Sequence, residues 1–253
     1  MSDLALGIDV GGTGIKGALV DTRTGTLLSE RIKYPTPPGG EPQDVFQVIG
    51  QIVQDVGEQA SGLPLGVCVP SVVQTGVTTS AANISDTWIG LHAEAELEAF
   101  LGRGIVFLND ADAAGVAEAH YGEARNEPGL TIVTTLGTGI GSAFLYDGEL
   151  LPNTELGHLE FEGREAESFL SAKARERNNT DWEVWAKGLE RFYRHLIRIF
   201  SPALILVGGG VSKTPELFMP YIDLPIPIRV AGLQNNAGIL GAAFLAHATR
   251  EVR

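Results

Sequence analysis

Gly12-Thr-Gly-Ile-Lys-Gly-Ala18 recurs as Gly137-Thr-Gly-Ile-Gly-Ser-Ala143, close to the middle of a chain of 253 residues. Each copy lies between two short apolar runs, which is the pattern of two strands joined by a tight glycine-rich turn. A match over so few residues can arise by chance, but each copy stands at the start of one half of the chain. The repeat therefore predicts a duplicated fold, in which two lobes that each begin strand–turn–strand flank a cleft.

Around the two copies, short apolar runs alternate with segments of helical periodicity, which indicates an α/β fold with a covered sheet. The predicted strands are Leu4–Val10, Lys16–Val20, Leu27–Lys33, Leu65–Val69, Ile105–Leu108, Thr131–Leu136, Ser142–Tyr146 and Leu204–Val207. Helices are predicted behind Pro42 as far as Val56, and over Ala111–Tyr121, Asp181–Phe200 and Asn236–Arg250. We expect a small N-terminal lobe of residues 1–110, completed by the C-terminal helix 236–253, and a large lobe of residues 111–235.

The composition limits the classes of function. The 18 basic and 31 acidic residues give a net charge of −13, which argues against broad binding to nucleic acid or to an anionic membrane. A single cysteine, Cys68, excludes an internal disulfide framework and a multi-cysteine zinc site. The N-terminal residues lack the pattern of a signal peptide, and no apolar run reaches the length of a spanning helix. We therefore expect a cytoplasmic protein.

The first copy of the repeat carries charged residues on both sides of its glycines. Glycines let main-chain N–H groups approach an anion closely, and a threonine hydroxyl and a lysine add further contacts to a phosphate. An aspartate at the strand end suits a Mg²⁺ ion held through water. The alternative is an ordinary glycine-rich hairpin. The residues of this predicted phosphate cradle are Asp9, Gly11, Gly12, Thr13, Gly14 and Lys16.

Two further glycine turns follow predicted strands. Gly137-Thr138-Gly139 belongs to the second copy of the repeat, and Gly208-Gly209-Gly210 follows the strand that ends at Val207. Glycines at the carboxyl edge of a sheet leave room for a phosphate chain or a nucleotide. Each turn alone is weak evidence, because glycine triplets also make ordinary strand-to-helix connections. Three such turns together favour a phosphoryl-transfer site.

Asn109 and Asp110 follow the apolar run that ends at Leu108 and precede a predicted helix, so they lie at the carboxyl end of a strand. Helix capping could explain one of these polar residues. It does not require both, which favours Asp110 as the general base toward an acceptor hydroxyl. Asn109 would then bond a neighbouring hydroxyl, and Asp112 would be the capping or solvent-facing acid.

Pro152-Asn-Thr-Glu-Leu-Gly-His-Leu-Glu160, with Glu167 behind it, combines carboxylates with one imidazole. Such groups suit a sugar site, because they can bond pairs of hydroxyls. The alternatives are a surface turn for Glu155 and a structural role for His158. A metal site is less favoured, since no cysteine lies nearby and no second histidine has ligand spacing.

A basic stripe is predicted on the helix 181–200. Its spacing of three and four residues aligns the cations on one face, where a polyanion could bind. The alternative is a solvated face that is partly paired with acids such as Glu183 and Glu190. The stripe consists of Lys187, Arg191, Arg194 and Arg198, and Lys173, Arg175 and Arg177 precede it.

These motifs together resemble the ROK family of sugar kinases (repressors, open reading frames and kinases), and within it the branch of polyphosphate glucokinases. The resemblance extends over essentially the whole chain. The segments that carry it are Gly7–Gly17, Asn109–Gly115, Leu136–Ser142, Pro152–Glu160, Ser171–Arg177 and Val207–Lys213.

The resemblance implies an actin-like, ribonuclease-H-like duplicated fold and a glucokinase that uses polyphosphate, and ATP, with Mg²⁺. It assigns Asp110 as the catalytic base that deprotonates the sugar 6-hydroxyl. The positions that match sugar-binding residues are Asn83, Asn109, Glu155, His158 and Glu167. The positions that match phosphate-binding turns are Gly12, Thr13, Lys16, Thr138 and Gly139, with Gly208 and Gly209 on the nucleotide side.

The chain departs from the common ROK pattern at two places. Most ROK kinases have a cysteine-rich zinc loop where this chain has Arg164, Glu165 and Ala166. The polyphosphate branch lacks that loop too. We therefore expect no zinc, and we expect His158 to contact sugar only. Ser71 follows Pro70 where the family usually has Pro-Gly, which could tighten the sugar pocket or shift its preference.

Competing functions remain open at this point. The leading function is the polyphosphate-dependent glucokinase, with mannose as a further acceptor. A strictly ATP-dependent ROK hexokinase is the alternative within catalysis. A sugar-responsive repressor is disfavoured, because the first phosphate strand begins at Leu4 and leaves no room for a helix-turn-helix. A non-catalytic sugar sensor requires that Asp110 is not a base. Family members are commonly dimers, so a homodimer is expected, with neither nucleic acid nor membrane as partner.

Overall fold

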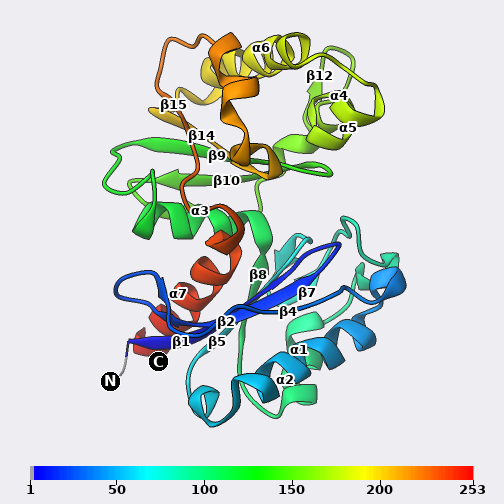
Figure 1. Ribbon diagram of the computed structural model, residues 1–253, viewed down its shortest axis with the longest axis vertical. Helices are drawn as coiled ribbons and strands as arrows, with labels where there is room; N and C mark the ends of the chain where they lie inside the picture. The colour runs from blue at the N-terminus through cyan, green and yellow to red at the C-terminus, as the bar shows by residue number, and fades with distance from the viewer. Residues whose placement is uncertain (1–2, 253) are drawn as a thin grey trace. The chain divides into compact units, whose positions relative to one another are not determined.

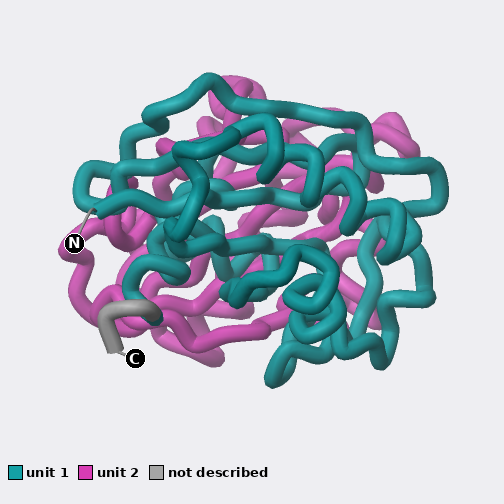
Figure 2. The backbone as a smooth tube through the Cα atoms, turned by 90° about the horizontal axis from the view of Figure 1, so that it is seen from below, with its two compact units in different colours: residues 1–117, 236–253 teal, residues 118–235 magenta. Residues whose placement is uncertain are grey.

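The computed structural model describes residues 3–252, and the chain forms two compact units. Unit 1 contains residues 1–117 and 236–253, and unit 2 contains residues 118–235 (Figure 2). The chain first passes from unit 1 to unit 2 inside helix α3 (Asp110–Tyr121), whereas the sequence predicted a boundary directly after Asp110. Because α3 continues as one helix, its first two turns belong to unit 1. Unit 1 also has the larger share of the residues, although the N-terminal lobe was expected to be the small one.

Unit 1 is built on a mixed sheet with the strand order β3-β2-β1-β5-β8, and β4 also pairs with β2. The hairpin β1–β2 is antiparallel, whereas β5 and β8 run parallel to β1. A separate small hairpin joins β6 to β7. The strands are β1 (Leu4–Val10), β2 (Ile15–Asp21), β3 (Thr26–Leu27), β4 (Ile32–Tyr34), β5 (Leu65–Val69), β6 (Val73–Gln74), β7 (Val77–Thr78) and β8 (Val106–Asn109).

Helices cover both faces of this sheet (Figure 1). The side chains of α1 (Pro42–Val56) and α2 (Ala93–Leu101) pack with one face in an apolar core, and those of α7 (Ala237–Val252) and α3 contact the other face. Full burial of each large apolar side chain, such as Ile49 on α1, contributes about 1.5–3 kcal/mol. Both faces of the central strands are therefore apolar, as the continuous runs in the sequence indicate.

Unit 2 has a sheet of the same strand order and the same directions, β11-β10-β9-β14-β15. The hairpins β9–β10 and β10–β11 are antiparallel, and β14 and β15 run parallel to β9. The small hairpin β12–β13 is separate. The strands are β9 (Leu130–Leu136), β10 (Ile140–Tyr146), β11 (Glu149–Leu151), β12 (Glu160–Phe161), β13 (Arg164–Glu165), β14 (Leu204–Gly209) and β15 (Ile228–Val230).

The long helix α6 (Trp182–Phe200) covers one face of the second sheet and buries Trp185, Leu189 and Phe192 against it (Figure 1). Asp181 caps its N-terminus by accepting a hydrogen bond from the Glu183 N–H over 3.4 Å. The short helices α4 (Glu167–Leu170) and α5 (Ala172–Arg177) precede it. None of the helices in residues 3–252 combines the length and apolarity needed to cross a membrane.

The α/β class is confirmed, and most predicted strands and helices agree with the structure to within a few residues. One predicted strand was wrong. Leu27–Lys33 is not continuous, because the chain leaves the sheet after β3 and returns at β4, and both short strands pair with β2. Between them Ser29 turns its hydroxyl to accept a hydrogen bond from the Leu19 N–H, which takes the place of a ladder bond.

Candidate functional site

The first glycine turn, Gly11–Gly14, closes the hairpin between β1 and β2. Val10 pairs with Ile15 across the ladder, and the Gly11 N–H donates to the Gly14 carbonyl oxygen over 3.1 Å. Gly12 and Thr13 are exposed at the tip. Exposed main-chain N–H groups in such a turn form a concave site for an anion, and the Thr13 hydroxyl adds a donor.

Asp9 and Lys16 face each other at the base of this turn. They are ladder partners, and Lys16 Nζ lies 3.2 Å from Asp9 Oδ2. The thiol of Cys68 on β5 donates to the other carboxylate oxygen, Oδ1, over 3.8 Å. Both charged side chains keep part of their surface exposed, so a ligand can reach the carboxylate and the ammonium.

The same region of unit 1 contains a second carboxylate. Burial raises the pKa of the Cys68 thiol well above its usual value, and the negative charges of Asp9 and Asp110 raise it further. The thiol therefore stays protonated and acts as a hydrogen-bond donor. Asp9 and Cys68 lie one residue before the ends of the parallel strands β1 and β5, and Asn109 ends β8 beside them. Asp110 therefore begins α3 at the edge where the first glycine turn lies.

Asn109 is the N-cap of α3. Its side-chain oxygen accepts hydrogen bonds from the N–H groups of Ala111, at 2.7 Å, and Asp112, at 3.1 Å. Its amide nitrogen donates to the carbonyl oxygen of Ser71 over 3.0 Å, which leaves one N–H for a ligand. The expectation that Asp112 is the cap or a solvent-facing acid was wrong, because Asp112 is buried behind the cap. The capped turn fixes the backbone of half-exposed Asp110.

Two loops of unit 1 approach these residues. Asn83, in the left-handed conformation with φ 63°, packs on the first turn, where a Cβ added to Gly12 would lie 2.9 Å from the Asn83 Cβ. Only glycine at position 12 permits this approach, so the predicted sugar-binding Asn83 adjoins the predicted phosphate turn. The Ser71 hydroxyl is buried and donates to the Ser80 carbonyl oxygen over 2.6 Å, which closes the loop that orients Asn109.

The second glycine turn, Gly137–Gly139, is one residue shorter. Leu136 pairs with Ile140, and the Gly137 N–H donates to the Gly139 carbonyl oxygen over 3.1 Å. Glu167 supports the turn, because its Oε2 accepts a hydrogen bond from the Ile140 N–H over 3.2 Å. Thr138 at the tip is exposed.

The third glycine turn lies beside the second within unit 2. Gly209 pairs with Leu136 in the β9–β14 ladder. Its φ is 81°, and an added Cβ would lie 2.5 Å from the Leu136 carbonyl oxygen, so the position requires glycine. Gly208 is buried and Gly209 is exposed. The predicted phosphate residues of unit 2 therefore lie along one sheet edge.

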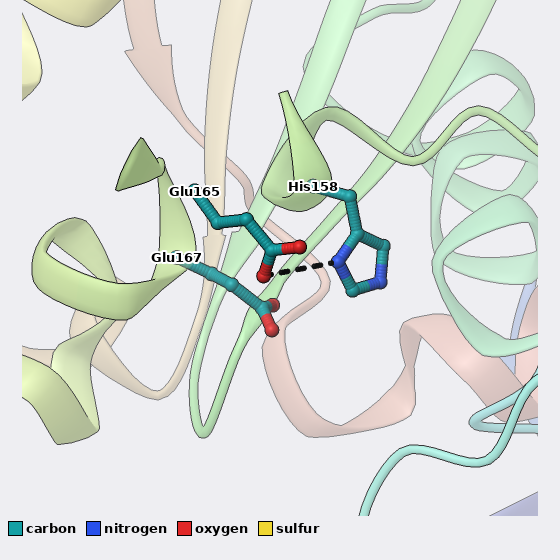
Figure 3. A group of neighbouring side chains, drawn as sticks. All are labelled: His158, Glu165 and Glu167. Carbon is teal, nitrogen blue, oxygen red and sulfur yellow. Dashed lines mark ion pairs between the residues drawn. The ribbon is translucent and has the colours of Figure 1, made fainter. Parts of the chain in front are cut away.

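Three side chains with metal-ligating or hydroxyl-binding atoms converge behind the second turn (Figure 3). Glu165 Oε2 lies 3.5 Å from His158 Nδ1, and one ligand atom from each of His158, Glu165 and Glu167 lies within 4.8 Å of the other two. The other ring nitrogen of His158 points away from both carboxylates. Glu165 therefore lies beside the His158 imidazole and can orient it, while contact of His158 with sugar stays a prediction.

Glu155, like Glu167, is a half-buried acid among the predicted sugar-binding residues of unit 2. Burial raises the pKa of its carboxyl group, and the charge of Glu167 adds to the shift while His158 opposes it. The charges of His158 and Glu167 both act on the Glu155 carboxyl group, so these three predicted sugar-binding residues form one electrostatic group. A partly desolvated carboxylate of this kind gains from hydroxyl donors that replace its lost water.

The basic stripe on α6 is exposed but largely paired. Lys187 Nζ lies 2.8 Å from Glu190 Oε2, and Arg194 Nε lies 3.3 Å from Glu190 Oε1. Arg191 forms two hydrogen bonds with Glu162, and Arg194 also lies within 3.8 Å of Asp223. The paired-face alternative therefore describes three of the four cations, with Arg198 as the exception among the described residues.

The predicted residues thus form one group in each unit. Unit 1 contains Asp9, Gly11, Gly12, Thr13, Gly14, Lys16, Asn83, Asn109 and Asp110. Unit 2 contains Gly137, Thr138, Gly139, Glu155, His158, Glu167, Gly208 and Gly209. The sequence had not singled out Glu165 as a neighbour of His158. The signal was the Glu162-Gly163 turn, a two-residue hairpin loop with both φ angles positive, which returns β13 alongside β12.

Comparison with known proteins extends this description. The family model described as the ROK family matches residues 5–169. The polyphosphate glucokinase of Mycobacterium tuberculosis strain H37Rv is 44% identical over 239 residues, which cover 94% of this chain and 89% of that protein. The chain belongs to the ROK family. The resemblance seen in its motifs is confirmed.

Two solved structures have a similar fold. The inorganic polyphosphate/ATP-glucomannokinase of Arthrobacter sp. strain KM superposes with a TM-score of 0.93 at 46% identity, covering 97% of this chain and 99% of that chain. The ROK family glucokinase of Streptomyces griseus, solved with glucose and AMPPNP, gives a TM-score of 0.81 at 23% identity, covering 97% and 99%. At 23% identity, the similarity to the Streptomyces griseus structure supports the fold alone.

Proposed function

We propose that the protein is a glucokinase that transfers a phosphoryl group from inorganic polyphosphate, and from ATP, to the 6-hydroxyl of glucose, and that it also accepts mannose. The observation that carries the proposal is the similarity, at 44% and 46% identity over nearly the whole chain, to proteins named polyphosphate glucokinase and polyphosphate/ATP-glucomannokinase. Asp110 at the capped start of α3 supplies the carboxylate that such a reaction needs.

Asp110 is the proposed general base. The 6-hydroxyl oxygen attacks the terminal phosphorus while its proton passes to the Asp110 carboxylate. As the new P–O bond forms, the bond to the remaining donor breaks, and its electron pair leaves on the donor oxygen. Such transfer depends on positioning and on electrostatic stabilisation. Asn109 contributes to positioning, because its cap holds the first turn of α3 and its remaining N–H can bond a sugar hydroxyl.

The remaining sugar contacts are proposed for Asn83 in unit 1 and for Glu155, His158 and Glu167 in unit 2. Carboxylates accept hydrogen bonds from sugar hydroxyls, and an imidazole whose Nδ1 faces Glu165 offers Nε2. The glycine turns would bind phosphate oxygens through main-chain N–H groups. We further propose that the two units are the lobes of a duplicated, ribonuclease-H-like fold, since their sheets share strand order and directions.

Mg²⁺ is the proposed cofactor, with Asp9 as its protein contact. Mg²⁺ usually keeps several waters and takes one or two carboxylates together with substrate phosphates. Asp9 fits this requirement, because its carboxylate is partly exposed at the base of the first turn, although Lys16 shares one of its oxygens. When bound, Mg²⁺ would neutralise charge on the donor phosphates.

A coupled assay of glucose 6-phosphate formation tests the proposal. Purified protein is given long-chain polyphosphate or ATP in parallel, with glucose or mannose as acceptor and with or without Mg²⁺. We expect turnover with both donors. Turnover with ATP alone would favour the strictly ATP-dependent hexokinase, and binding of glucose without turnover on either donor would favour a sugar sensor. Light scattering on the same preparation tests the proposed homodimer.

A further inference from the structure

An acidic chain with a net charge of −13 needs unpaired cations wherever it holds a polyanion. On α6, Lys187, Arg191 and Arg194 lie within ion-pair distance of carboxylates, so much of their charge is offset. A polyphosphate that bound there would have to displace those carboxylates. Cations without carboxylate partners, beside the glycine turns, would bind the same ligand at lower cost.

Most of the five lysines of the chain lie beside the glycine turns. Lys16 and Lys33 adjoin the first turn: Lys16 pairs with Asp9, and a Cβ on Gly14 would lie 2.9 Å from the Lys33 Cε. Lys173 and Lys213 adjoin the second and third turns of unit 2. Lys187 is the one lysine on α6. Four of five lysines therefore lie at glycine turns.

Lys173 is anchored to the second turn by its main chain. Its N–H donates to the Gly137 carbonyl oxygen over 3.1 Å, and its side chain is exposed. The neighbouring cations are engaged elsewhere, since the Arg175 guanidinium stacks 3.7 Å from the Trp182 ring and Arg177 donates to the Ser168 carbonyl oxygen. Within the described part of the chain, no carboxylate lies within ion-pair distance of Lys173. Its ammonium is thus available to a ligand at the turn.

Lys213 has the corresponding position beside the third turn. It ends the 3-10 helix Gly210–Lys213, which follows Gly209 directly, and the Ser212 hydroxyl donates to the Gly209 carbonyl oxygen over 2.8 Å. The Lys213 side chain is exposed and has no carboxylate within ion-pair distance among residues 3–249. Because Gly209 pairs with Leu136, the two lysines flank adjacent turns on one sheet edge.

We propose that Lys173 and Lys213 bind phosphate groups of polyphosphate beyond the one that is transferred, and so favour long donors; the inference rests on the proposed function. A polyphosphate presents a repeating row of singly charged groups with no fixed register. A lysine ammonium is a compact charge on a flexible stem, which can follow such a row, whereas an arginine fork matches one fixed pair of oxygens. ATP ends in a nucleoside after three phosphates and gains less from these contacts.

Charge-removing variants test the proposal in the full-length protein. K173Q, K213Q and the double variant are compared with R125Q, which removes an exposed cation of the same unit that is not assigned to the donor. We expect each single variant to raise the KM for long-chain polyphosphate about three- to tenfold, with a smaller change for ATP and none for glucose. K173R and K213R keep the positive charge, so they should retain most of the affinity for polyphosphate.

Salt dependence supplies a second readout. When a variant makes one phosphate contact fewer, its binding to polyphosphate releases fewer counterions. The slope of log KM against log salt should therefore fall by about one for polyphosphate in each single variant. Thermal unfolding of every variant should match the wild type, since both side chains are exposed. A change in KM with an unchanged melting temperature therefore reports binding.

Three outcomes would overturn the proposal: equal effects on polyphosphate and ATP, effects no larger than those of R125Q, or a larger polyphosphate effect from K187Q on α6. The last outcome would assign the donor to the predicted stripe instead. The wild-type assay separates this test from the proposed function. If the wild type uses no polyphosphate, the proposed function fails, whereas wild-type use with unaffected variants refutes only the two lysines.

Discussion

The two hairpins of the repeat share antiparallel strands joined by a glycine turn, but their turns differ by one residue and their charges differ. In β1–β2 the second ladder pair from the turn is Asp9 and Lys16, while the corresponding pair in β9–β10 is Thr135 and Gly141. The second turn instead receives its charged neighbours from elsewhere in unit 2: Glu167 from α4 supports it, and the Lys173 main chain is bonded to it.

The difference indicates how a repeated scaffold acquires two roles. Both turns expose main-chain N–H groups, which suffice to bind an anion of any kind. The two carboxylates proposed for phosphoryl transfer, Asp9 and Asp110, both lie in unit 1. Unit 2 contains the acidic and imidazole groups of the proposed sugar site and the two lysines proposed to bind polyphosphate, Lys173 and Lys213. We therefore expect variants of unit 1 to change turnover and variants of unit 2 to change affinity.

Asp110→Asn should have the largest effect. The amide cannot take the proton of the 6-hydroxyl, so kcat should fall about 10²- to 10⁴-fold with either donor, while the KM for glucose changes little. Steady-state kinetics measures both. Asp112→Asn, two residues along α3 and buried, is the matched control, and it should lower the melting temperature with kcat within about threefold. Retained turnover in D110N would remove the assignment of the chemistry to unit 1.

Asp9→Asn compares the two turns directly. Loss of the carboxylate leaves Lys16 without its partner and removes the proposed contact to Mg²⁺, so kcat should fall at least about tenfold and half-maximal activity should need more Mg²⁺. A Mg²⁺ titration of activity measures the shift. Thr135→Ala, at the equivalent position of the second hairpin, should stay within about twofold of the wild type. Equal losses from both variants would show that the charge difference between the turns is irrelevant to turnover.

Glu155→Gln should change affinity and its pH dependence. Because burial raises the pKa of this carboxyl group in the folded protein, it begins to take up a proton at a higher pH than an exposed glutamate does. Protonation removes an acceptor for a sugar hydroxyl, so the KM for glucose should rise as the pH falls. In E155Q the KM for glucose should be a few-fold higher than in the wild type and should not rise further as the pH falls.

The same shift predicts a change in stability. A raised folded-state pKa means that the contribution of Glu155 to stability is present in acid and is lost as the pH rises through that pKa. E155Q should therefore melt at a higher temperature than the wild type near neutral pH, and the gain should disappear in acid. Exposed Glu160 is the control, and E160Q should show neither effect. A wild-type KM for glucose that is flat in acid would contradict the role of Glu155.

Much of the fold could be predicted from the sequence, because the repeat and the apolar runs directly encode buried strands and their turns. The strand predicted over Leu27–Lys33 failed, since residue preferences do not reveal that Ser29 replaces a ladder bond with its hydroxyl. The hairpin β12–β13 was missed because two strands of two residues each carry almost no periodicity.

The site was predictable as a set of residues but less so as a set of contacts. Asn109 and Asp112 are both ordinary capping residues, and only the structure shows that Asn109 makes the bonds. The pairing of the α6 cations was predictable only within the helix, where Glu190 lies three and four residues from its partners. Glu162 and Asp223 approach Arg191 and Arg194 from distant segments, which spacing alone cannot reveal.

Replacing Arg191 and Arg194 together by alanine should have the smallest effect on turnover and affinity. The stripe predicts a higher KM for polyphosphate with ATP spared. Because Glu162, Glu190 and Asp223 already lie beside these guanidinium groups, removing both cations also uncovers negative charge, and exposed pairs of this kind contribute about 0–1 kcal/mol each. We expect a change in the KM for polyphosphate below about threefold, measured beside K173Q in the same assay. A rise larger than that of K173Q, with ATP spared, would show that the donor displaces these carboxylates and that unit 2 binds polyphosphate along α6 rather than at its glycine turns.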